Sequence, residues 1–301
     1  MLKLAPLPLF GVLMSGCQTV PTAPTATLQF QQVRINGVEL PYIEQGQGVP
    51  VVFLHGSMTD YRIWEAQRLA VAPRYRFIAY TQRYFGSQRW PDDGKNFSQA
   101  THAADLVAFI KGLDVGPVHV VAWSYGGSVA TLAASQHPEL FRSLSLHEPT
   151  IGSLIVGTPE GKLAVSDFGK EVGRLRGVAN AGDTWRATQQ FWEFVLRLPD
   201  GGFLGEPPAL QQIVRDNERS VPLTLNAPPQ PITCEMVKAI RVPVLVTVGA
   251  NTRALWALAG AALQKCVPDG ELIGIPNSNH DAIVRNPEAF NRALLGFLDR
   301  H

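Results

Sequence analysis

The sequence carries little charge and almost no excess of either sign. Asp, Glu, Lys and Arg make up 17% of the 301 residues, and the formal net charge is only +1. No run of like charges occurs along the chain. A nucleic-acid partner needs a concentrated basic face, so this pattern predicts that the protein does not bind nucleic acid.

Cysteine is also scarce, with residues only at positions 17, 234 and 266. In an oxidising compartment Cys234 and Cys266 could form a disulfide. We expect Cys234 to open one helix and Cys266 to close another. If both helices run in the same direction on one face of a sheet, the thiols lie at opposite ends, and the spacing that a disulfide needs is hard to meet. The sequence therefore favours two free thiols over a bridge.

The N-terminus lacks an apolar run long enough to span a bilayer. Residues 4–14 are apolar and follow Lys3, the only charge in the first 33 residues, which fits a secretory signal. The next residues read Met-Ser-Gly-Cys at 14–17 and resemble the lipobox of bacterial lipoproteins. In that family the signal is cut before the cysteine, whose thiol carries a lipid. A plain cleaved signal, or an unstructured start with a chance cysteine, is the alternative.

The resemblance implies a signal peptide at residues 1–16 and a lipid attached to Cys17. Residues 18–26 are rich in Thr, Pro and Ala, which is typical of a flexible tether, and we place that tether at residues 17–27. The expected location is the cell envelope of a bacterium, with the protein anchored to a membrane and facing the periplasm. If the lipobox is not used, the protein is secreted.

Apolar segments that alternate with helical patterns dominate the rest of the chain. Two β-rich segments, 28–35 and 38–44, flank Asn36-Gly37, which is a strong hairpin signal. The pattern predicts a doubly wound, mostly parallel α/β sheet. The further expected strands are 49–54, 75–80, 118–122, 143–146, 242–248 and 271–275, and the expected helices are 60–69, 98–113, 126–136, 253–265 and 287–298.

One long segment, 150–231, breaks this alternation because it has no obvious buried strand. It carries four aromatic residues at mostly helical spacing, followed by many prolines. We interpret it as a helical cap inserted into a core made of residues 28–149 and 232–301. Most of the aromatics are expected to form the core of the cap, and the alternative is an apolar wall facing the substrate. They are Trp185, Phe191, Trp192 and Phe194.

The strongest functional signal is the turn around Ser124. A buried run at 118–122 ends just before it, and a helix rich in small residues begins just after it. The segment resembles the nucleophile elbow of α/β-hydrolases, G-x-S-x-G, whose tight turn requires small residues on both sides of the serine. Gly126 fits, and Ala122 replaces the first glycine. The resemblance implies the α/β-hydrolase fold with Ser124 as nucleophile.

An upstream segment resembles the oxyanion-hole loop of the same family. Residues 51–57 read Val-Val-Phe-Leu-His-Gly-Ser, a strand that ends in His-Gly. By resemblance, the backbone N–H groups of Ser57 and Tyr125 are the two oxyanion donors. We expect His55 to brace this loop rather than act as the base, and we place it with Trp123 among the side chains beside the substrate.

The family's chain order of Ser, acid and His points to His280 as the base. This residue lies in a loop after the expected strand 271–275 and before a terminal amphipathic helix. Four other histidines fit less well, because they lie in a predicted helix, in a strand, at a helix end or at the terminus. They are His102, His119, His137 and His301.

Two loops compete for the acid. Many α/β-hydrolases carry an Asp after the strand expected here at 242–248, but this loop offers only Asn251, which cannot stabilise an imidazolium by charge. Some members, haloalkane dehalogenases among them, carry the acid after the preceding strand, where this sequence has Glu148. The spacing from the nucleophile resembles theirs. We therefore predict Glu148, with Asp281 as the fallback.

The resemblance implies a serine-triad reaction, which needs neither a metal nor an organic cofactor. The expected partner is a small-molecule substrate, and the expected reaction is cleavage of an ester or related acyl bond of a small to medium apolar compound. Haloalkane dehalogenases and epoxide hydrolases need an Asp nucleophile, so Ser124 argues against both. A cofactor-free oxygenase or C–C hydrolase, and a non-catalytic binding protein on the same fold, remain alternatives.

Overall fold

A computed structural model of the protein describes residues 27–301. The expected signal peptide, the lipid-bearing Cys17 and all but the last residue of the expected tether lie outside this range, so these assignments stay predictions. Within residues 27–301, no helix combines the length and the apolar character that a bilayer crossing requires.

The centre of the structure is an eight-stranded sheet with the order β1-β2-β4-β3-β5-β6-β7-β8. β1 and β2 form the expected antiparallel hairpin, and Asn36 and Gly37 both take the positive φ values that its tight turn needs. β2 also pairs antiparallel with β4, and every later pair is parallel. The mostly parallel sheet is therefore confirmed. The strands are β1 (Gln29–Ile35), β2 (Val38–Gln45), β3 (Pro50–Leu54), β4 (Arg76–Tyr80), β5 (Val118–Trp123), β6 (Phe141–His147), β7 (Val244–Gly249) and β8 (Gly270–Ile275).

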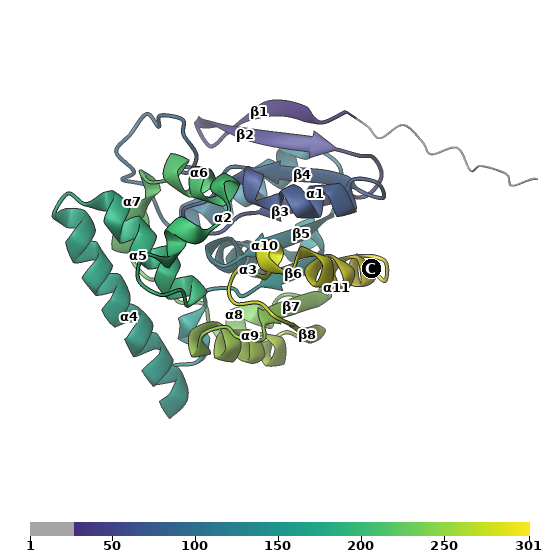
Figure 1. Ribbon diagram of the computed structural model, residues 1–301. Coiled ribbons are helices and arrows are strands. Elements are labelled where there is room, and N and C mark those ends of the chain that lie inside the picture. The colour runs from purple at the N-terminus through teal and green to yellow at the C-terminus, as the bar shows by residue number, and fades with distance from the viewer. Residues whose placement is uncertain (1–26) are drawn as a thin grey trace, which may run out of the picture.

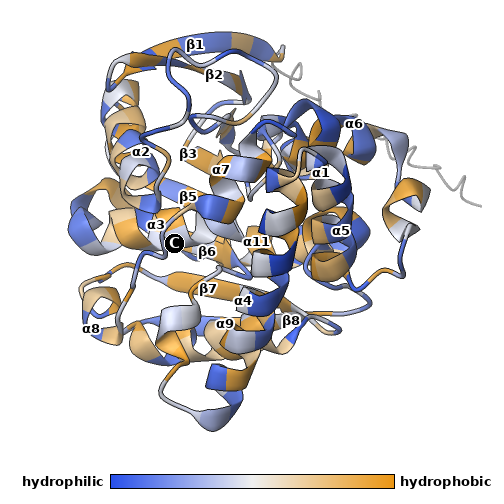
Figure 2. Cartoon of the chain, turned by 90° about the vertical axis from the view of Figure 1, so that its left-hand side faces the viewer, coloured by the Kyte–Doolittle hydropathy of each residue, from blue (hydrophilic) through white to orange (hydrophobic). Residues whose placement is uncertain are grey.

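Helices cover both faces of the sheet, because alternate strand residues point to opposite sides. In β3, Val52 and Leu54 pack toward α2 and α3, whereas Val51 and Phe53 pack toward α1 and α11. Figure 2 shows β3 and β7 as strongly hydrophobic at the centre of the molecule. The core helices are η1 (Tyr61–Trp64), α1 (Glu65–Val71), α2 (Gln99–Leu113), α3 (Tyr125–Gln136), η2 (Pro138–Leu140), α8 (Cys234–Val237), α9 (Ala254–Cys266), α10 (Ala282–Arg285) and α11 (Pro287–Leu298).

The expected cap segment contains helices and no strand. These helices lie together on one side of the sheet (Figure 1). Trp192 is buried in the packing between cap and core, whereas Trp185, Phe191 and Phe194 are only partly buried. The elements of the cap are η3 (Gly152–Leu154), α4 (Pro159–Asn180), α5 (Thr184–Leu196), η4 (Gly202–Gly205), α6 (Pro208–Asp216) and α7 (Ser220–Asn226).

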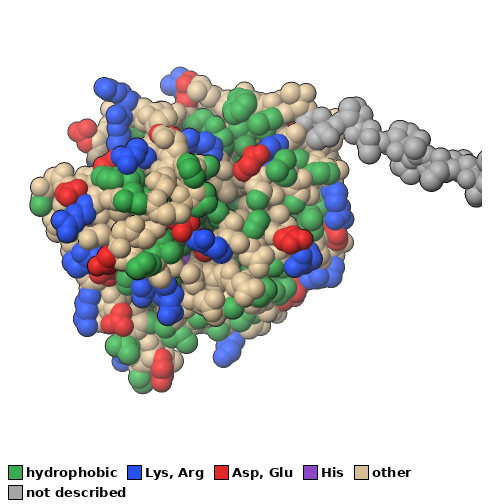
Figure 3. All heavy atoms as spheres, in the orientation of Figure 1, with side chains coloured by type: hydrophobic (Ala, Val, Ile, Leu, Met, Phe, Trp, Pro, Cys, Tyr) green, Lys and Arg blue, Asp and Glu red, His purple; other side chains and the backbone are tan. Residues whose placement is uncertain are grey.

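The surface carries charges of both signs. Figure 3 shows acidic and basic side chains interspersed on one face of the molecule, with apolar side chains between them.

The expectation of two free thiols is wrong. Cys234 and Cys266 form a disulfide, and their Cα atoms lie 5.2 Å apart. Cys266 ends α9 as expected, but α8, which Cys234 opens, has only 4 residues. A helix of that length spans about 6 Å, so its two ends lie close together. The prediction assumed two full-length helices, and α8 instead packs as one turn against α9.

The disulfide should contribute to stability because it closes a long loop in the unfolded chain. Its cysteines are separated by 32 positions. Replacing both Cys234 and Cys266 by Ser should lower the free energy of unfolding by about 3 kcal/mol, as measured by urea denaturation. Wild-type protein unfolded in a reducing buffer is the control and should approach the double variant. Two free thiols at these positions in the folded, unreduced protein would contradict the bridge.

Candidate active site

Ser124 lies at a sharp turn between β5 and α3. It has a positive φ of 54°, a backbone conformation that is costly for a residue with a side chain. Its N–H donates to the carbonyl oxygen of His147 at 2.9 Å, which ties the turn to the end of β6. At Gly126 an added Cβ would lie 2.3 Å from the carbonyl oxygen of His55, so a side chain does not fit. The expected strand–turn–helix around the serine is present.

A chain of hydrogen bonds connects Ser124, His280 and Glu148. Ser124 Oγ lies 2.8 Å from His280 Nε2, and His280 Nδ1 lies 2.6 Å from Glu148 Oε2. A carboxylate only accepts, so Nδ1 carries the ring proton, Nε2 accepts, and the Ser124 hydroxyl donates to it. These three side chains, which are far apart in the sequence, meet at the carboxyl edge of the sheet.

Glu148 is fully buried, and both of its carboxylate oxygens are hydrogen bonded. The N–H of Gly249 donates to Oε1 at 2.6 Å, and the hydroxyl of Thr252 donates to Oε2 at 2.7 Å. A buried carboxylate is costly unless donors satisfy it, and here the last residue of β7 and the loop after it supply them. Gly249 and Thr252 belong to a segment that offers no carboxylate of its own, and they hold the carboxylate of Glu148, which follows the neighbouring strand β6.

Neither alternative acid contacts the imidazole of His280. Asn251 is exposed, and its recorded hydrogen bond joins its backbone N–H to the carbonyl oxygen of Ser278. Asp281 is buried, and its carboxylate accepts from Arg285 instead. Of the three candidates, only Glu148 lies within hydrogen-bonding distance of His280 Nδ1.

Ser57 and Tyr125 line a cavity together with Ser124, and among residues 27–301 neither backbone N–H donates to a protein acceptor. Tyr125 is the first residue of α3, where an N–H has no partner within the helix. Gly56 allows the loop to approach, because an added Cβ would lie 3.0 Å from the ring of Trp123. Two open donors beside a nucleophile are able to stabilise an oxyanion.

His55 braces the oxyanion loop, and the expectation that it lies beside the substrate is not met. It is fully buried and does not line the cavity. Its Nε2 accepts from the N–H of Gln82 at 2.9 Å, so Nδ1 carries the proton and donates to the carbonyl oxygen of Gly56 at 2.8 Å. Burial lowers the pKa of His55 to about 4, which keeps the ring neutral.

Trp123 holds the loop that carries the base. Its indole N–H donates to the carbonyl oxygen of His280 at 2.8 Å. Its ring lines a void of about 10 Å³ beside Ser124 and does not border the large cavity. The expected contact with substrate is therefore limited to this small space.

A cavity of about 470 Å³ opens above Ser124, and the cap provides most of its walls. Most lining side chains are apolar, among them Val165, Phe168, Phe191 and Leu255. Phe191 thus faces the cavity, in line with the substrate-wall alternative for the cap aromatics. In the part of the chain that the structure describes, the single charged residue of the lining is Arg176 on α4.

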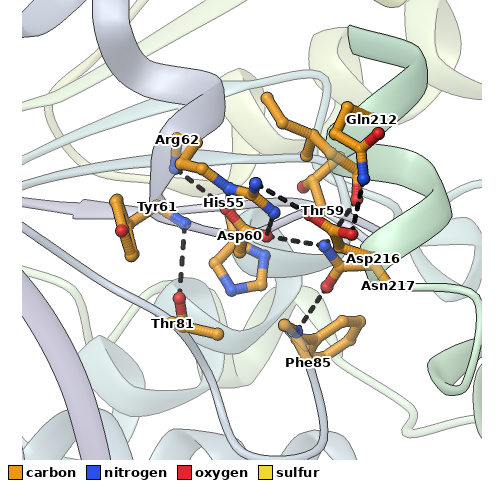
Figure 4. Close-up of polar contacts among 12 residues, drawn as sticks. His55, Thr59, Asp60, Tyr61, Arg62, Thr81, Phe85, Gln212, Asp216 and Asn217 are labelled. Atoms are coloured by element: carbon orange, nitrogen blue, oxygen red, sulfur yellow. Dashed lines mark hydrogen bonds and ion pairs between the residues drawn. The ribbon is translucent and has the colours of Figure 1, made fainter. Parts of the chain in front are cut away.

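The cap is tied to the loop after β3 by a polar network whose central residues, Asp60 and Asn217, are buried (Figure 4). Asp60 accepts from the guanidinium of Arg62 at 2.7 and 2.8 Å and from Asn217 Nδ2 at 2.7 Å. Asn217 Oδ1 accepts from the N–H of Gly86 at 2.6 Å, and Arg62 also pairs with Asp216 of α6 at 2.8 Å. This network connects the loop after β3, the loop after β4 and the cap.

The network also explains why a carboxylate is tolerated in a buried position. Burial alone would raise the pKa of Asp60, but the hydrogen bonds and charge of Arg62, helped by Asn217, hold it below its usual value. This cluster was not predicted from the sequence. The position of Asp60 just before a helical turn could have been recognised as a helix cap from neighbouring residues. Its partner Asn217 is 157 positions away, so no local pattern connects the two.

Two residues close to the triad were also missed. The ring of Trp256 stacks on that of His280, with centroids 3.9 Å apart and planes inclined by 25°. Its indole N–H donates to Thr150 Oγ1 at 3.1 Å, and that oxygen lies 3.3 Å from Ser124 Oγ. Thr150 could have been noticed because it follows Glu148 by two positions. No pattern in the sequence marks Trp256.

Comparison with known proteins agrees with this geometry. Residues 51–293 match the model of the alpha/beta hydrolase family. A 2-(acetamidomethylene)succinate hydrolase of Mesorhizobium japonicum is 24% identical, over 89% of this chain and 95% of the relative. A non-heme chloroperoxidase of Kitasatospora aureofaciens is 26% identical, over 88% and 98% of the two chains.

Among solved structures, a thermophilic esterase from Thermogutta terrifontis has a TM-score of 0.70 at 21% identity, over 90% of this chain and 98% of that one. At this identity the likeness shows the fold alone. The family match, by contrast, extends from β3 into α11 and includes most of the chain. The chain therefore belongs to the alpha/beta hydrolase family.

Proposed function

We propose that the protein is a serine hydrolase that cleaves an ester or related acyl bond of a small to medium apolar substrate through an acyl-enzyme on Ser124. The observation that carries this proposal is the continuous hydrogen-bond chain from Glu148 through His280 to Ser124, which ends at the base of the cavity. One relative in sequence is a 2-(acetamidomethylene)succinate hydrolase, which agrees with a hydrolytic reaction.

The geometry supports a two-step reaction. His280 Nε2 takes the Ser124 proton as Oγ attacks the acyl carbonyl, and the N–H groups of Ser57 and Tyr125 stabilise the oxyanion. Glu148 holds the protonated ring in place. His280 then protonates the leaving group, and a water molecule, activated by the same nitrogen, releases the acyl group.

The shape of the cavity supports an apolar acyl group. A volume of about 470 Å³ lies within the range of pockets that bind small molecules, and the walls are mainly aliphatic and aromatic. Such walls favour binding by burial of apolar surface, at roughly 25 cal/mol per Å². They offer few donors or acceptors for a highly polar substrate.

A fluorophosphonate probe tests the nucleophile. It should label Ser124 covalently, and the Ser124→Ala variant should not be labelled. The same substitution should lower kcat for short p-nitrophenyl esters by about 10³-fold or more, because the acyl-enzyme can no longer form. Labelling without ester turnover would favour an oxygenase or C–C hydrolase, and absence of labelling in the wild type would favour a binding protein.

The position of the acid is tested by a pair of variants. Glu148→Gln keeps the shape of the side chain but removes the charge that holds and stabilises the imidazolium, so kcat should fall by about 10²-fold or more. Asn251→Ala is the matched control, since its exposed side chain does not contact His280, and kcat should stay within about twofold. The reverse ranking of the two kcat values would remove the acid role from Glu148.

A further inference from the structure

We propose that Thr150 is a hydrogen-bond donor to the reacting oxygen of Ser124 and that it assists the release of the acyl group. This inference rests on the proposed function. The Thr150 hydroxyl lies 3.3 Å from Ser124 Oγ and borders the same cavity. It would act on the serine oxygen itself, whereas Ser57 and Tyr125 act on the carbonyl oxygen of the substrate.

The direction of the hydrogen bond follows from the donors around it. An indole N–H can only donate, so Trp256 Nε1 occupies one acceptor site of Thr150 Oγ1 at 3.1 Å. The Ser124 hydroxyl gives its proton to His280 and is free to accept. The Thr150 proton is therefore directed toward Ser124 Oγ, and Trp256 sets that orientation.

Thr150 is held in place from several sides. Its N–H donates to the carbonyl oxygen of Ser124 at 3.2 Å, and its own carbonyl oxygen accepts from the Ser128 hydroxyl at 2.9 Å. Trp256 is fixed in turn by stacking on the ring of His280. The donor is thus positioned before any substrate binds, which is the condition for a useful contribution to a transition state.

The contribution belongs mainly to deacylation. Water adds to the acyl carbonyl and gives a proton to His280. The bond between the carbonyl carbon and Ser124 Oγ then breaks, its electron pair returns to Oγ, and His280 returns the proton to this oxygen. Negative charge gathers on Oγ as the bond breaks, so a donor from Thr150 stabilises this step, and Thr150 keeps its own proton throughout.

Stopped-flow kinetics with p-nitrophenyl butyrate separates the acylation burst from the steady rate of deacylation. Thr150→Val keeps the shape of the side chain and removes the donor, so deacylation should slow about tenfold and acylation by no more than about threefold. Thr150→Ser keeps the hydroxyl and should restore the deacylation rate to within about threefold.

Trp256→Phe provides a second readout. This substitution keeps an aromatic ring over His280 but frees the Thr150 hydroxyl to rotate. Introduced alone, it should slow deacylation, and introduced together with Thr150→Val, it should cause no further slowing. The proposal would be overturned if Thr150→Val left the rate of deacylation unchanged. It would also be overturned if Thr150→Val slowed acylation and deacylation equally and the rates stayed as slow in Thr150→Ser. A wild type that forms no acyl-enzyme would overturn the proposed function, independently of any Thr150 variant.

A second, independent observation concerns the charge of the cavity. We infer that Arg176 binds a carboxylate at the far end of the substrate, which again rests on the proposed function. Among residues 27–301 it is the only charged residue lining the cavity, and it is exposed to solvent. Its Nε donates to the carbonyl oxygen of Leu225 at 2.8 Å, which orients the guanidinium. Among residues 27–301, no carboxylate pairs with it, so its terminal N–H groups remain available to an anion.

Two esters of equal length test this inference: p-nitrophenyl hexanoate and mono-p-nitrophenyl adipate, which adds a terminal carboxylate. Arg176→Met should lower kcat/KM for the adipate ester about tenfold and leave that for the hexanoate ester within about twofold. Arg174→Met is the matched control, because Arg174 lies on the same helix, pairs with Glu171 and does not line the cavity. It should change neither value.

Binding to the Ser124→Ala variant gives the same information without catalysis. Adipamic acid should bind about tenfold more tightly than hexanamide, as followed by tryptophan fluorescence, and Arg176→Met should remove the difference. Equal binding of the two compounds, or equal effects of Arg176→Met on both esters, would overturn the inference. A wild type that binds adipamic acid selectively but hydrolyses neither ester would overturn the proposed function and leave the carboxylate site standing.

Discussion

The site depends on one close approach between two backbone segments. The first turn of α3 lies so near the end of β3 that a Cβ at Gly126 would lie 2.3 Å from the carbonyl oxygen of His55. Because Gly126 has no side chain, the turn at Ser124 and the loop of Ser57 can come together. That approach brings Ser124, Ser57 and Tyr125 together in the lining of one cavity.

The parallel sheet then places the other groups. β5, β6 and β7 are neighbours, so the residues that follow them meet at one edge. Ser124 follows β5 and Glu148 follows β6, while Gly249 ends β7 and donates to the Glu148 carboxylate. A buried negative charge needs such donors, and the backbone of β7 offers one without a further side chain. Glu148 can thus be charged and immobile beside His280.

The cap has a different task from the sheet. The turns and loops that follow the strands carry the proposed nucleophile Ser124, the proposed acid Glu148 and the proposed base His280. The cap supplies most of the apolar walls of the cavity and, among residues 27–301, its single charged side chain. The two parts are joined by Asp60 and Asn217, both buried, so the cap is held at the loop that carries Ser57. One fold can serve many reactions in this way, because the reacting groups are held by the sheet and the contacts that select the substrate lie on an insertion.

Features that depend on neighbouring residues could be predicted from the sequence. Local conformation and hydrophobic periodicity are set within a few positions of the chain. The sequence therefore predicted the Asn36-Gly37 hairpin, the alternating strands and helices, the turn at Ser124 and the loop of His280. Glu148 was predicted as the acid from a resemblance, and the structure then showed its carboxylate against the imidazole of His280. Only the tertiary structure joined Cys234 to Cys266 and brought Trp256 to Thr150. Trp256 and Thr150 are 106 positions apart, and Glu148 and His280 are 132 apart. Contacts over such separations depend on strand order, helix length and packing, none of which a local pattern contains.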